Sequence, residues 1–320
     1  MNAGPDLPAI LAGRERITAH IHRTPVMTCR SLDEMANARI FFKCENLQRT
    51  GSFKMRGASN AIFSLSEKDA AFGVVTHSSG NHAAAIACAA RLRGIPAWVV
   101  MPENSSRAKL AAVEGYGGYV TLCAPTLEAR ESTANKLVAG SGATLIHPYN
   151  DDRIIAGQAT AAVELLEEIT ELDMVIAPVS GGGLLSGTAI AAKSMRPAIR
   201  VVGGEPKNAD DAFRSLESGE IEPAAAGKTM ADGLRATLCE RTFAIIRERV
   251  DEIATVTEEE ILQAMRAVWE RMKIIIEPSS AVAVAPLLTR RVRAEGMRVG
   301  VILSGGNLDL DHLPFGAPPH

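Results

Sequence analysis

Short apolar runs alternate along the chain with longer segments in which apolar residues recur at helical spacing. The apolar runs predict strands at 40–44, 73–76, 97–101, 119–123, 174–179, 200–203 and 299–303. The helical spacing predicts helices at 10–22, 55–65, 81–93, 106–114, 127–138, 151–169 and 258–272. Thr257 and Glu260 have the spacing of a capping box at the start of the last helix. We expect an irregular stretch after Ser218, where Ala, Gly and Pro are frequent.

This alternation predicts an α/β fold in which helices flank parallel sheets, because short connections between strand and helix are typical of βαβ units. The chain shows no internal repeat of 20–50 residues and no low-complexity linker. We predict two domains. A small mobile domain at 72–148 is inserted in a larger, cofactor-binding domain formed by 1–71 and 149–320.

Composition narrows the function classes. The chain has 320 residues, 47% of them apolar, which is enough for a sizeable core, and its net charge of -3 gives no basic surface for nucleic acid. No apolar run approaches the roughly 18 residues of a membrane span, and the N-terminus does not read as a secretory signal. We therefore expect no nucleic-acid or membrane partner. The five cysteines are scattered, which indicates reduced thiols in a cytoplasmic protein.

The first candidate for chemistry is the lysine in Thr-Gly-Ser-Phe-Lys-Met-Arg-Gly, residues 50–57. Gly51 allows a tight turn, and Ser52 is expected to cap the helix that follows. Lys54 would then lie at a helix N-terminus, where the positive end of the dipole lowers the pKa of an ammonium group. A free amine is what Schiff-base chemistry requires. A single lysine is usually a solvated surface residue, so this hypothesis depends on three further motifs.

Ser-Ser-Gly-Asn-His at 78–82 directly follows a predicted strand. Backbone N–H groups at such a turn can bind a carboxylate, although serine and asparagine also occur there as ordinary caps. Leu-Ser-Gly-Gly-Asn at 303–307 ends the last strand, at the edge where open α/β sheets bind ligands.

Three consecutive glycines, Gly181 to Gly183, separate a strand from a helix and would let the backbone approach a phosphate group. The alternative is a dinucleotide fold, because Glu205 follows Gly183 at the spacing of a ribose-binding acid. That fingerprint is incomplete, since Ser186 stands where the third glycine belongs. No Gly-Lys-Ser/Thr follows, so a P-loop is excluded.

A weaker cluster begins at Glu205 and continues to Asp211. Two carboxylates and a main-chain carbonyl in this segment could bind a hard cation together with water. The alternative is an acid-rich helix N-terminus.

Together the four motifs resemble fold-type II pyridoxal-phosphate enzymes, and most of all the serine/threonine dehydratase and serine racemase family. Ser-Phe-Lys-Met-Arg-Gly is similar to the family's cofactor-lysine motif and Ser-Ser-Gly-Asn-His to its substrate-carboxylate loop. The three glycines are similar to its phosphate cup, and Leu-Ser-Gly-Gly-Asn to the segment that meets the pyridine nitrogen. The similarity extends from Ile10 to Asp309. It implies the two-domain fold-type II architecture and a homodimer.

The resemblance implies that Lys54 holds pyridoxal 5'-phosphate and, once released, removes the Cα proton as a general base. A serine at 304 would leave the pyridine nitrogen neutral, which suits β-elimination. The implied cofactor contacts are Phe53, Lys54, Asn81, Ser180, Gly181, Gly182, Gly183, Leu184, Gly233, Glu277 and Ser304. The implied substrate contacts are Ser78, Ser79, Asn81 and His82, with Ser79 also placed for acid–base work opposite Lys54. The implied site for structural magnesium or calcium is Glu205, Ala209 and Asp211.

Two departures from the family bear on the substrate. Ala236 replaces a serine that contacts the substrate hydroxyl in serine racemases, and Ala83-Ala84-Ala85 lacks the common Gly-Gln. Arg130 and Arg235 could bind a second acidic group, because the guanidinium fork matches a carboxylate.

We therefore expect a lyase that converts serine, threonine or 3-hydroxyaspartate to a 2-oxo acid and ammonia. The alternatives are a serine/aspartate-type racemase with side dehydratase activity, and a non-enzymatic cofactor- or metal-binding protein.

Overall fold

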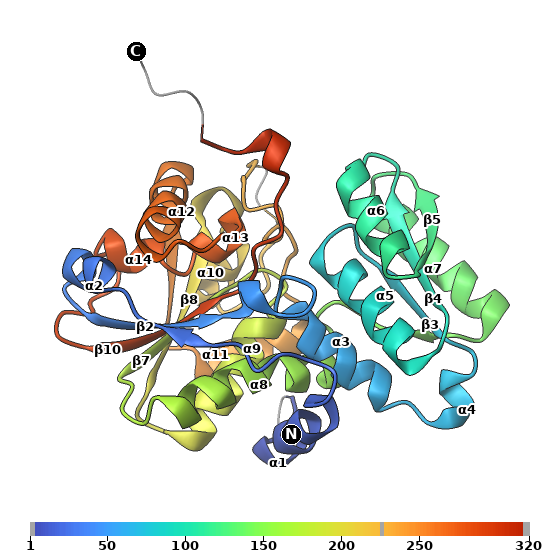
Figure 1. Cartoon of the computed structure of the whole chain (residues 1–320), viewed down its shortest axis with the longest axis horizontal. Helices are drawn as coiled ribbons and strands as arrows, with labels where there is room; N and C mark the ends of the chain where they lie inside the picture. The colour runs from blue at the N-terminus through green and yellow to red at the C-terminus, as the bar shows by residue number, and fades with distance from the viewer. Residues whose placement is uncertain (1–3, 225–226, 316–320) are drawn as a thin grey trace.

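The computed structural model describes residues 4–224 and 227–315 and contains two sheets (Figure 1). The larger sheet has the strand order β1-β2-β10-β7-β8-β9, and only β1 runs antiparallel to its neighbour. The smaller sheet has the order β5-β4-β3-β6 and is parallel throughout. The expected α/β architecture is confirmed. The strands of the larger sheet are β1 (Val26–Met27), β2 (Arg39–Cys44), β7 (Met174–Pro178), β8 (Arg200–Pro206), β9 (Glu252–Val256) and β10 (Arg298–Leu303).

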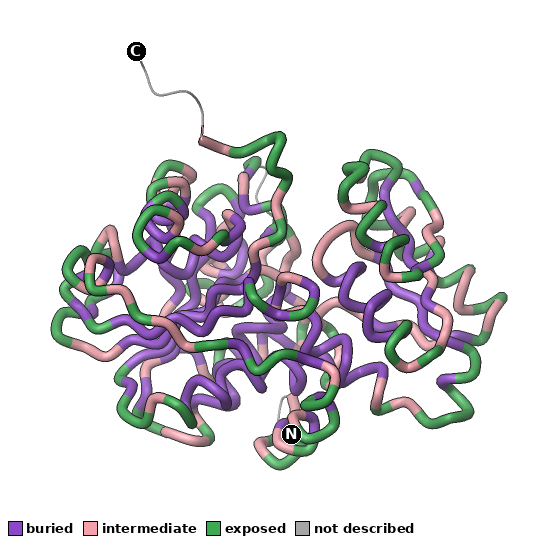
Figure 2. Tube along the Cα trace, viewed as in Figure 1, coloured by how far each residue is buried: buried purple, intermediate pink, exposed green. Residues whose placement is uncertain are grey.

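Helices cover both faces of the larger sheet because successive side chains of each strand point to opposite faces. On β2, Ile40 and Phe42 join one apolar layer and Phe41 joins the other. Figure 2 shows the buried chain concentrated between these layers. The first layer contains α2 (Arg30–Ala36), α12 (Glu258–Met272), α13 (Pro278–Ala281) and α14 (Ala285–Leu288). The second contains α1 (Leu7–Ile17), α8 (Asp152–Glu168), α9 (Gly183–Met195), α10 (Asp211–Ser218) and α11 (Glu240–Arg249).

The smaller sheet has its own two apolar layers, and Figure 1 shows it beside the larger one. Its strands are β3 (Val74–His77), β4 (Ala97–Pro102), β5 (Tyr119–Cys123) and β6 (Thr144–Leu145). The helix α7 (Leu127–Ser141) covers one face, and α5 (Asn81–Arg93) and α6 (Arg107–Gly115) cover the other. The helix α3 (Lys54–Phe63) packs on both α5 and α8 and so joins the two lobes, while α4 (Glu67–Ala70) leads into β3. We propose that this lobe is the core of the small domain at 72–148.

Most predicted elements agree with the structure to within one or two residues, and the capping box of Thr257 and Glu260 is present. Three predictions are wrong in detail. The first helix ends at Ile17 rather than His22. Ser52 does not cap α3, because the N-cap is Phe53 and it forms no side-chain cap bond. The irregular stretch after Ser218 is followed by α11 and β9, which the sequence did not predict, because α11 carries many charges and β9 has only five residues.

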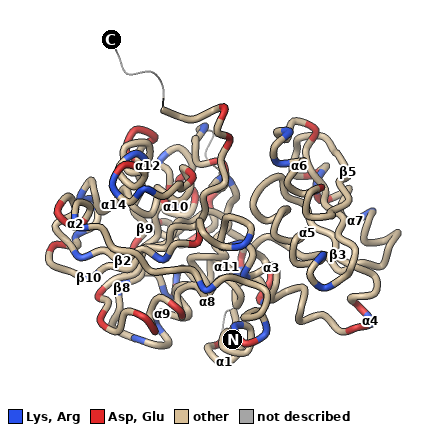
Figure 3. Tube along the Cα trace, viewed as in Figure 1, with Lys and Arg blue, Asp and Glu red and all other residues tan. Residues whose placement is uncertain are grey.

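Acidic and basic side chains are mixed over both lobes in Figure 3. Within the described residues, no helix combines the length and the apolar character that crossing a membrane would require.

Candidate active site

A cleft of about 920 Å³ is lined by both lobes. The smaller lobe contributes the turn between β3 and α5 together with α6 and α7, and the larger lobe contributes the starts of α3 and α9 and the end of β10. The cleft brings together every residue that the sequence predicted for catalysis, cofactor binding or substrate binding. They are Phe53, Lys54, Ser78, Ser79, Asn81, His82, Arg130, Ser180, Gly181, Gly182, Gly183, Leu184, Gly233, Arg235, Glu277 and Ser304.

Three of the helices that begin at this cleft have no side-chain cap. They are α3, α5 and α9, whose N-caps are Phe53, Gly80 and Gly182. Two others that begin there, α6 and α7, are capped by Ser106 and Thr126. Three long helices elsewhere, α1, α8 and α12, are capped by Asp6, Asp151 and Thr257. An uncapped helix start leaves N–H groups and the positive end of the dipole available to an anion. The cleft can therefore accept more than one anionic group.

Lys54 is the first residue of α3 and lies on the wall of the cleft. Desolvation lowers the pKa of its ammonium group to about 8, against the opposing effect of the nearby Glu277 carboxylate. At neutral pH a useful fraction of Lys54 is therefore free amine. Its Nζ donates to the carbonyl of Pro148 at 3.3 Å and lies 5.1 Å from the centroid of the Phe53 ring.

The three glycines form the turn into α9, and two of them are required by their surroundings. A Cβ on Gly181 would lie 2.4 Å from the ring of Tyr149, and Gly182 has a φ of +89°. The Ser180 hydroxyl donates to the carbonyl of Ala236 at 3.0 Å and accepts from its N–H at 2.9 Å. The loop is thus fixed by packing and side-chain bonds, while the first N–H groups of α9 remain uncapped. This cradle fits a phosphate group.

The turn before α5 is held to the larger lobe through Asn81. Its amide nitrogen donates to Glu277 at 2.9 Å, and its amide oxygen accepts from Asn307 at 2.9 Å. Burial raises the pKa of Glu277 to about 8, against the lowering effect of the Asn81 hydrogen bond. The alternative that the serines here are only caps is wrong, because the N-cap is Gly80 and it forms no side-chain cap bond.

Three histidines line the cleft: His77, His82 and His147. Burial lowers the pKa of each, that of His82 well below its usual value and that of His147 to about 4. They are therefore neutral at physiological pH and act as dipoles rather than as charges.

The sequence did not predict His147, Pro148 or Tyr149 as site residues. They closely follow β6, so the rule that ligands bind beyond the carboxyl ends of strands could have found them. The ring of Tyr149 packs on the glycine loop, and the carbonyl of Pro148 accepts from Lys54.

Positive side chains from both lobes face the cleft. Arg235 is exposed and uses its guanidinium once, donating to the carbonyl of Thr229 at 2.7 Å. Arg130 is half-buried on α7, and its Nε donates to the carbonyl of Thr126 at 3.4 Å. Lys109 of α6 forms an ion pair at 2.5 Å with Asp232 of the larger lobe. Of these cations, Arg235 and Arg130 have the planar fork that suits a carboxylate.

The predicted cation-binding residues lie outside the cleft lining, at the end of β8. The Glu205 carboxylate accepts from the N–H groups of Ala212 at 2.9 Å and Phe213 at 2.7 Å, so it caps α10. These bonds leave it poorly placed to bind a ribose, which argues against the dinucleotide alternative. Burial raises the pKa of Glu205 to about 9 and that of Asp211 to about 6. No cluster of three or more His, Cys, Asp or Glu side chains with metal-site geometry occurs in residues 4–224 and 227–315.

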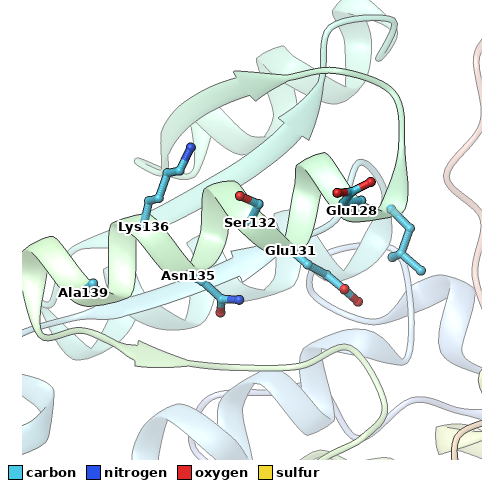
Figure 4. Close-up of a pocket in the computed structure, with 7 residues that line it drawn as sticks. Glu128, Glu131, Ser132, Asn135, Lys136 and Ala139 are labelled. Carbon is cyan, nitrogen blue, oxygen red and sulfur yellow. The ribbon is translucent and has the colours of Figure 1, made fainter.

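A second hollow, of about 790 Å³, runs along α7 (Figure 4). Every residue that lines it belongs to this one helix, and only Leu127 and Glu131 also line the cleft. We assign no chemistry to it.

Comparison with known proteins gives one consistent family. The model for "Pyridoxal-phosphate dependent enzyme" matches residues 17–305. Serine racemase of Dictyostelium discoideum is 51% identical over 96% of this chain and 96% of its own, and its crystal structure superposes with a TM-score of 0.92. The beta-hydroxyaspartate dehydratase of Paracoccus denitrificans is 48% identical over 97% of this chain and 99% of its own. The crystal structure of a threonine deaminase from T.th. has a TM-score of 0.90 at 43% identity and covers 96% of this chain and 99% of that one.

Proposed function

The chain belongs to the pyridoxal-phosphate-dependent enzyme family, and from this premise we propose that it is a dehydratase, or ammonia-lyase, of β-hydroxy-α-amino acids. The candidate substrates are serine, threonine and 3-hydroxyaspartate, and the products are a 2-oxo acid and ammonia. The observation that carries the proposal is the convergence of three uncapped helix starts on one cleft beside a lysine of lowered pKa. Relatives named as a hydroxyaspartate dehydratase and a threonine deaminase support it.

The residues of the cleft fit pyridoxal 5'-phosphate. The uncapped start of α9 and the Ser180–Gly183 loop would hold its phosphate, Lys54 would bind its aldehyde carbon, and Ser304 would meet its ring nitrogen. When bound, the cofactor supplies an electron sink for the bond that breaks at Cα. Phe53, Asn81, Leu184, Gly233 and Glu277 complete the proposed contacts.

The protein itself supplies binding and proton transfer. The Ser78–His82 turn and the uncapped start of α5 would bind the substrate carboxylate. Lys54, as a free amine, would take the Cα proton as general base, and its lowered pKa places it near the operating pH. The three neutral histidines line the cleft without adding charge to it.

The direct test is a panel of amino acids assayed for release of 2-oxo acid. We expect release from at least one β-hydroxy amino acid and none from alanine, which has no β-substituent to eliminate. Release from none of the panel, with cofactor bound, would contradict the proposal.

A second candidate is an amino-acid racemase, supported by the relative named serine racemase and by Ser79 in the cleft. Racemisation requires acid–base groups on both faces of Cα, whereas elimination requires one. Ser79→Ala is therefore expected to reduce racemisation by about 10²–10⁴-fold and dehydration much less. The measurement is the rate of each reaction with one substrate. Ser78→Ala is the comparison: Ser78 belongs to the turn that would bind the substrate carboxylate, so its loss should affect both reactions alike. Equal loss of both activities would argue against this role for Ser79.

We also propose a structural magnesium or calcium ion held by Glu205, Asp211, the carbonyl of Ala209 and water. Two buried carboxylates lie close together here, and Oδ2 of Asp211 is buried without a hydrogen-bond partner in the described structure. Carboxylate, carbonyl and water oxygens are the ligands that these ions prefer.

Removal of the cation with EDTA is expected to lower the melting temperature. An ion at a hundred times its Kd stabilises the fold by about 2.7 kcal/mol. Asp211→Asn should make the melting temperature insensitive to EDTA. Asp210→Asn is the control, because Asp210 pairs with Arg214 instead. A wild-type melting temperature that EDTA leaves unchanged would rule out the cation.

The family resemblance also supports a cytoplasmic homodimer, and sedimentation of the purified protein would test the oligomeric state.

A further inference from the structure

Four charged side chains lie buried together behind the proposed cofactor lysine. They are Lys43 on β2, Glu45 directly after it, Arg56 on α3 and Glu164 on α8, and each side chain is at most 5% exposed. We refer to them as the buried quartet. Its two cations balance its two anions.

Arg56 is the centre of the quartet. Its guanidinium group donates two hydrogen bonds to the Glu45 carboxylate, from Nε at 2.7 Å and from one terminal nitrogen at 2.8 Å. It also binds both oxygens of Glu164, each at 2.8 Å. Lys43 donates to Glu164 and to the carbonyl of Thr24, both at 2.6 Å.

Stability alone does not explain these charges. Removing ions from water is costly, and well-packed apolar residues of similar volume often stabilise a core equally well or better. The paired hydrogen bonds instead fix the placement of Arg56, because two parallel hydrogen bonds to a carboxylate set both the position and the orientation of a guanidinium group.

The buried quartet thereby fixes the position of the first turn of α3. Lys54 begins this helix, and Arg56, two residues later, points to the other side, because successive residues turn by about 100°. A rotation or shift of α3 that moved Lys54 would also break the paired hydrogen bonds of Arg56 to Glu45 and Glu164.

No cap performs this role. Phe53 makes no capping bond, and the buried Ser52 hydroxyl has no partner in the described structure. Instead, the Arg56 side chain ties the first turn to the end of β2 through Glu45 and to α8 through Glu164, on the side away from the cleft. Beside Arg56, a Cβ on Gly157 would lie 2.6 Å from the Arg56 carbonyl oxygen, so α3 and α8 are in close contact.

We propose that Arg56 is a positioning residue for Lys54: through the buried quartet it fixes where the lysine amine lies in the cleft and in which direction it points. This inference rests on the proposed function of Lys54 as the cofactor lysine. It concerns the placement of that lysine, and the residues of the quartet do not line the cleft.

The test separates cofactor binding from formation of the lysine link in the full-length enzyme. After the native cofactor is removed, pyridoxal 5'-phosphate is added, and the link is followed by absorbance and by borohydride trapping with mass analysis of the Lys54 peptide. Binding without a link is measured with deoxypyridoxine phosphate, which lacks the aldehyde. The variants are Arg56→Lys, Arg56→Met and Glu164→Gln.

We expect folded Arg56→Lys to bind deoxypyridoxine phosphate as the wild type does and to form the link about 10- to 100-fold more slowly, the cost of a misplaced reacting group. Leu165→Ala is the matched control, because Leu165 neighbours Glu164 on α8 but packs toward the larger sheet. It should lower the melting temperature and leave the linking rate unchanged.

Wild-type linking rates in Arg56→Lys and Glu164→Gln would overturn the proposal. So would a slower link in Leu165→Ala that follows its loss of stability. If Arg56→Met does not fold, the other two variants decide the outcome. A Lys54→Ala chain that still forms the link elsewhere would contradict the proposed function instead, so the two failures are distinguishable.

Discussion

Lys54→Ala is expected to lose about 10⁴-fold in turnover, the upper end of what one positioned acid–base group contributes, while the fold is retained. Two functions disappear at once, because the same amine would hold the cofactor and take the Cα proton. The variant should still bind pyridoxal 5'-phosphate at the start of α9, without borohydride-trappable label. The measurements are 2-oxo acid release and the mass of the trapped peptide.

The pH dependence of the wild type gives a second measure of the same residue. The pKa of Lys54 is lowered to about 8, so the fraction of free amine rises as pH increases through that value. The rate of linking to added cofactor should rise over the same range and level off above it. Lys109→Ala is the matched control, since Lys109 lines the same cleft but pairs with Asp232.

Near wild-type turnover in Lys54→Ala would refute the catalytic assignment.

The sequence was sufficient for the architecture and for the motif residues that meet at the cleft. Strand and helix periods are local, and the motifs at 54, 78–82, 180–185 and 303–307 each follow or precede a strong element. Because the carboxyl ends of parallel strands share an edge, motifs far apart along the chain converge there. The motifs after β7 and β10 of the larger sheet show this. Asn81 follows β3 of the smaller sheet and joins them across the cleft through hydrogen bonds to Glu277 and Asn307.

The features that the sequence could not predict depend on contacts between residues that are far apart along the chain. Ser52 has the residue type of a cap, yet Arg56 holds the turn through Glu45 and Glu164, and nothing in the local sequence marks Glu164 as its partner. Likewise, the glycine at 181 was attributed to a phosphate alone. The structure adds the ring of Tyr149, which a Cβ there would meet at 2.4 Å. Glu205 was predicted as a cation ligand, and that role stays a prediction; what the structure adds is that its carboxylate caps α10.

The choice among serine, threonine and 3-hydroxyaspartate rests on the positive side chains of the cleft. The Ser78–His82 turn is proposed to bind the α-carboxylate, so a further guanidinium group at the cleft favours a substrate with a second acidic group. Arg235 is exposed at the cleft and, within the described residues, its guanidinium makes one hydrogen bond, to the Thr229 carbonyl. Ala236 beside it has no hydroxyl to hold that of serine. The relative named beta-hydroxyaspartate dehydratase supports the same substrate.

Arg235→Ala is accordingly expected to weaken turnover of 3-hydroxyaspartate and to spare threonine. A charge-assisted bidentate contact contributes about 1.5–3 kcal/mol, which corresponds to about 10- to 100-fold in kcat/KM. Arg235→Lys keeps the charge without the fork and should recover part of the loss. Arg130→Ala tests whether the half-buried arginine of α7 shares the role. The measurement is kcat/KM for both substrates in each variant. An equal loss on both, or no turnover of 3-hydroxyaspartate by the wild type, would reject the dicarboxylate substrate and leave serine and threonine, because these need only the α-carboxylate site and Lys54.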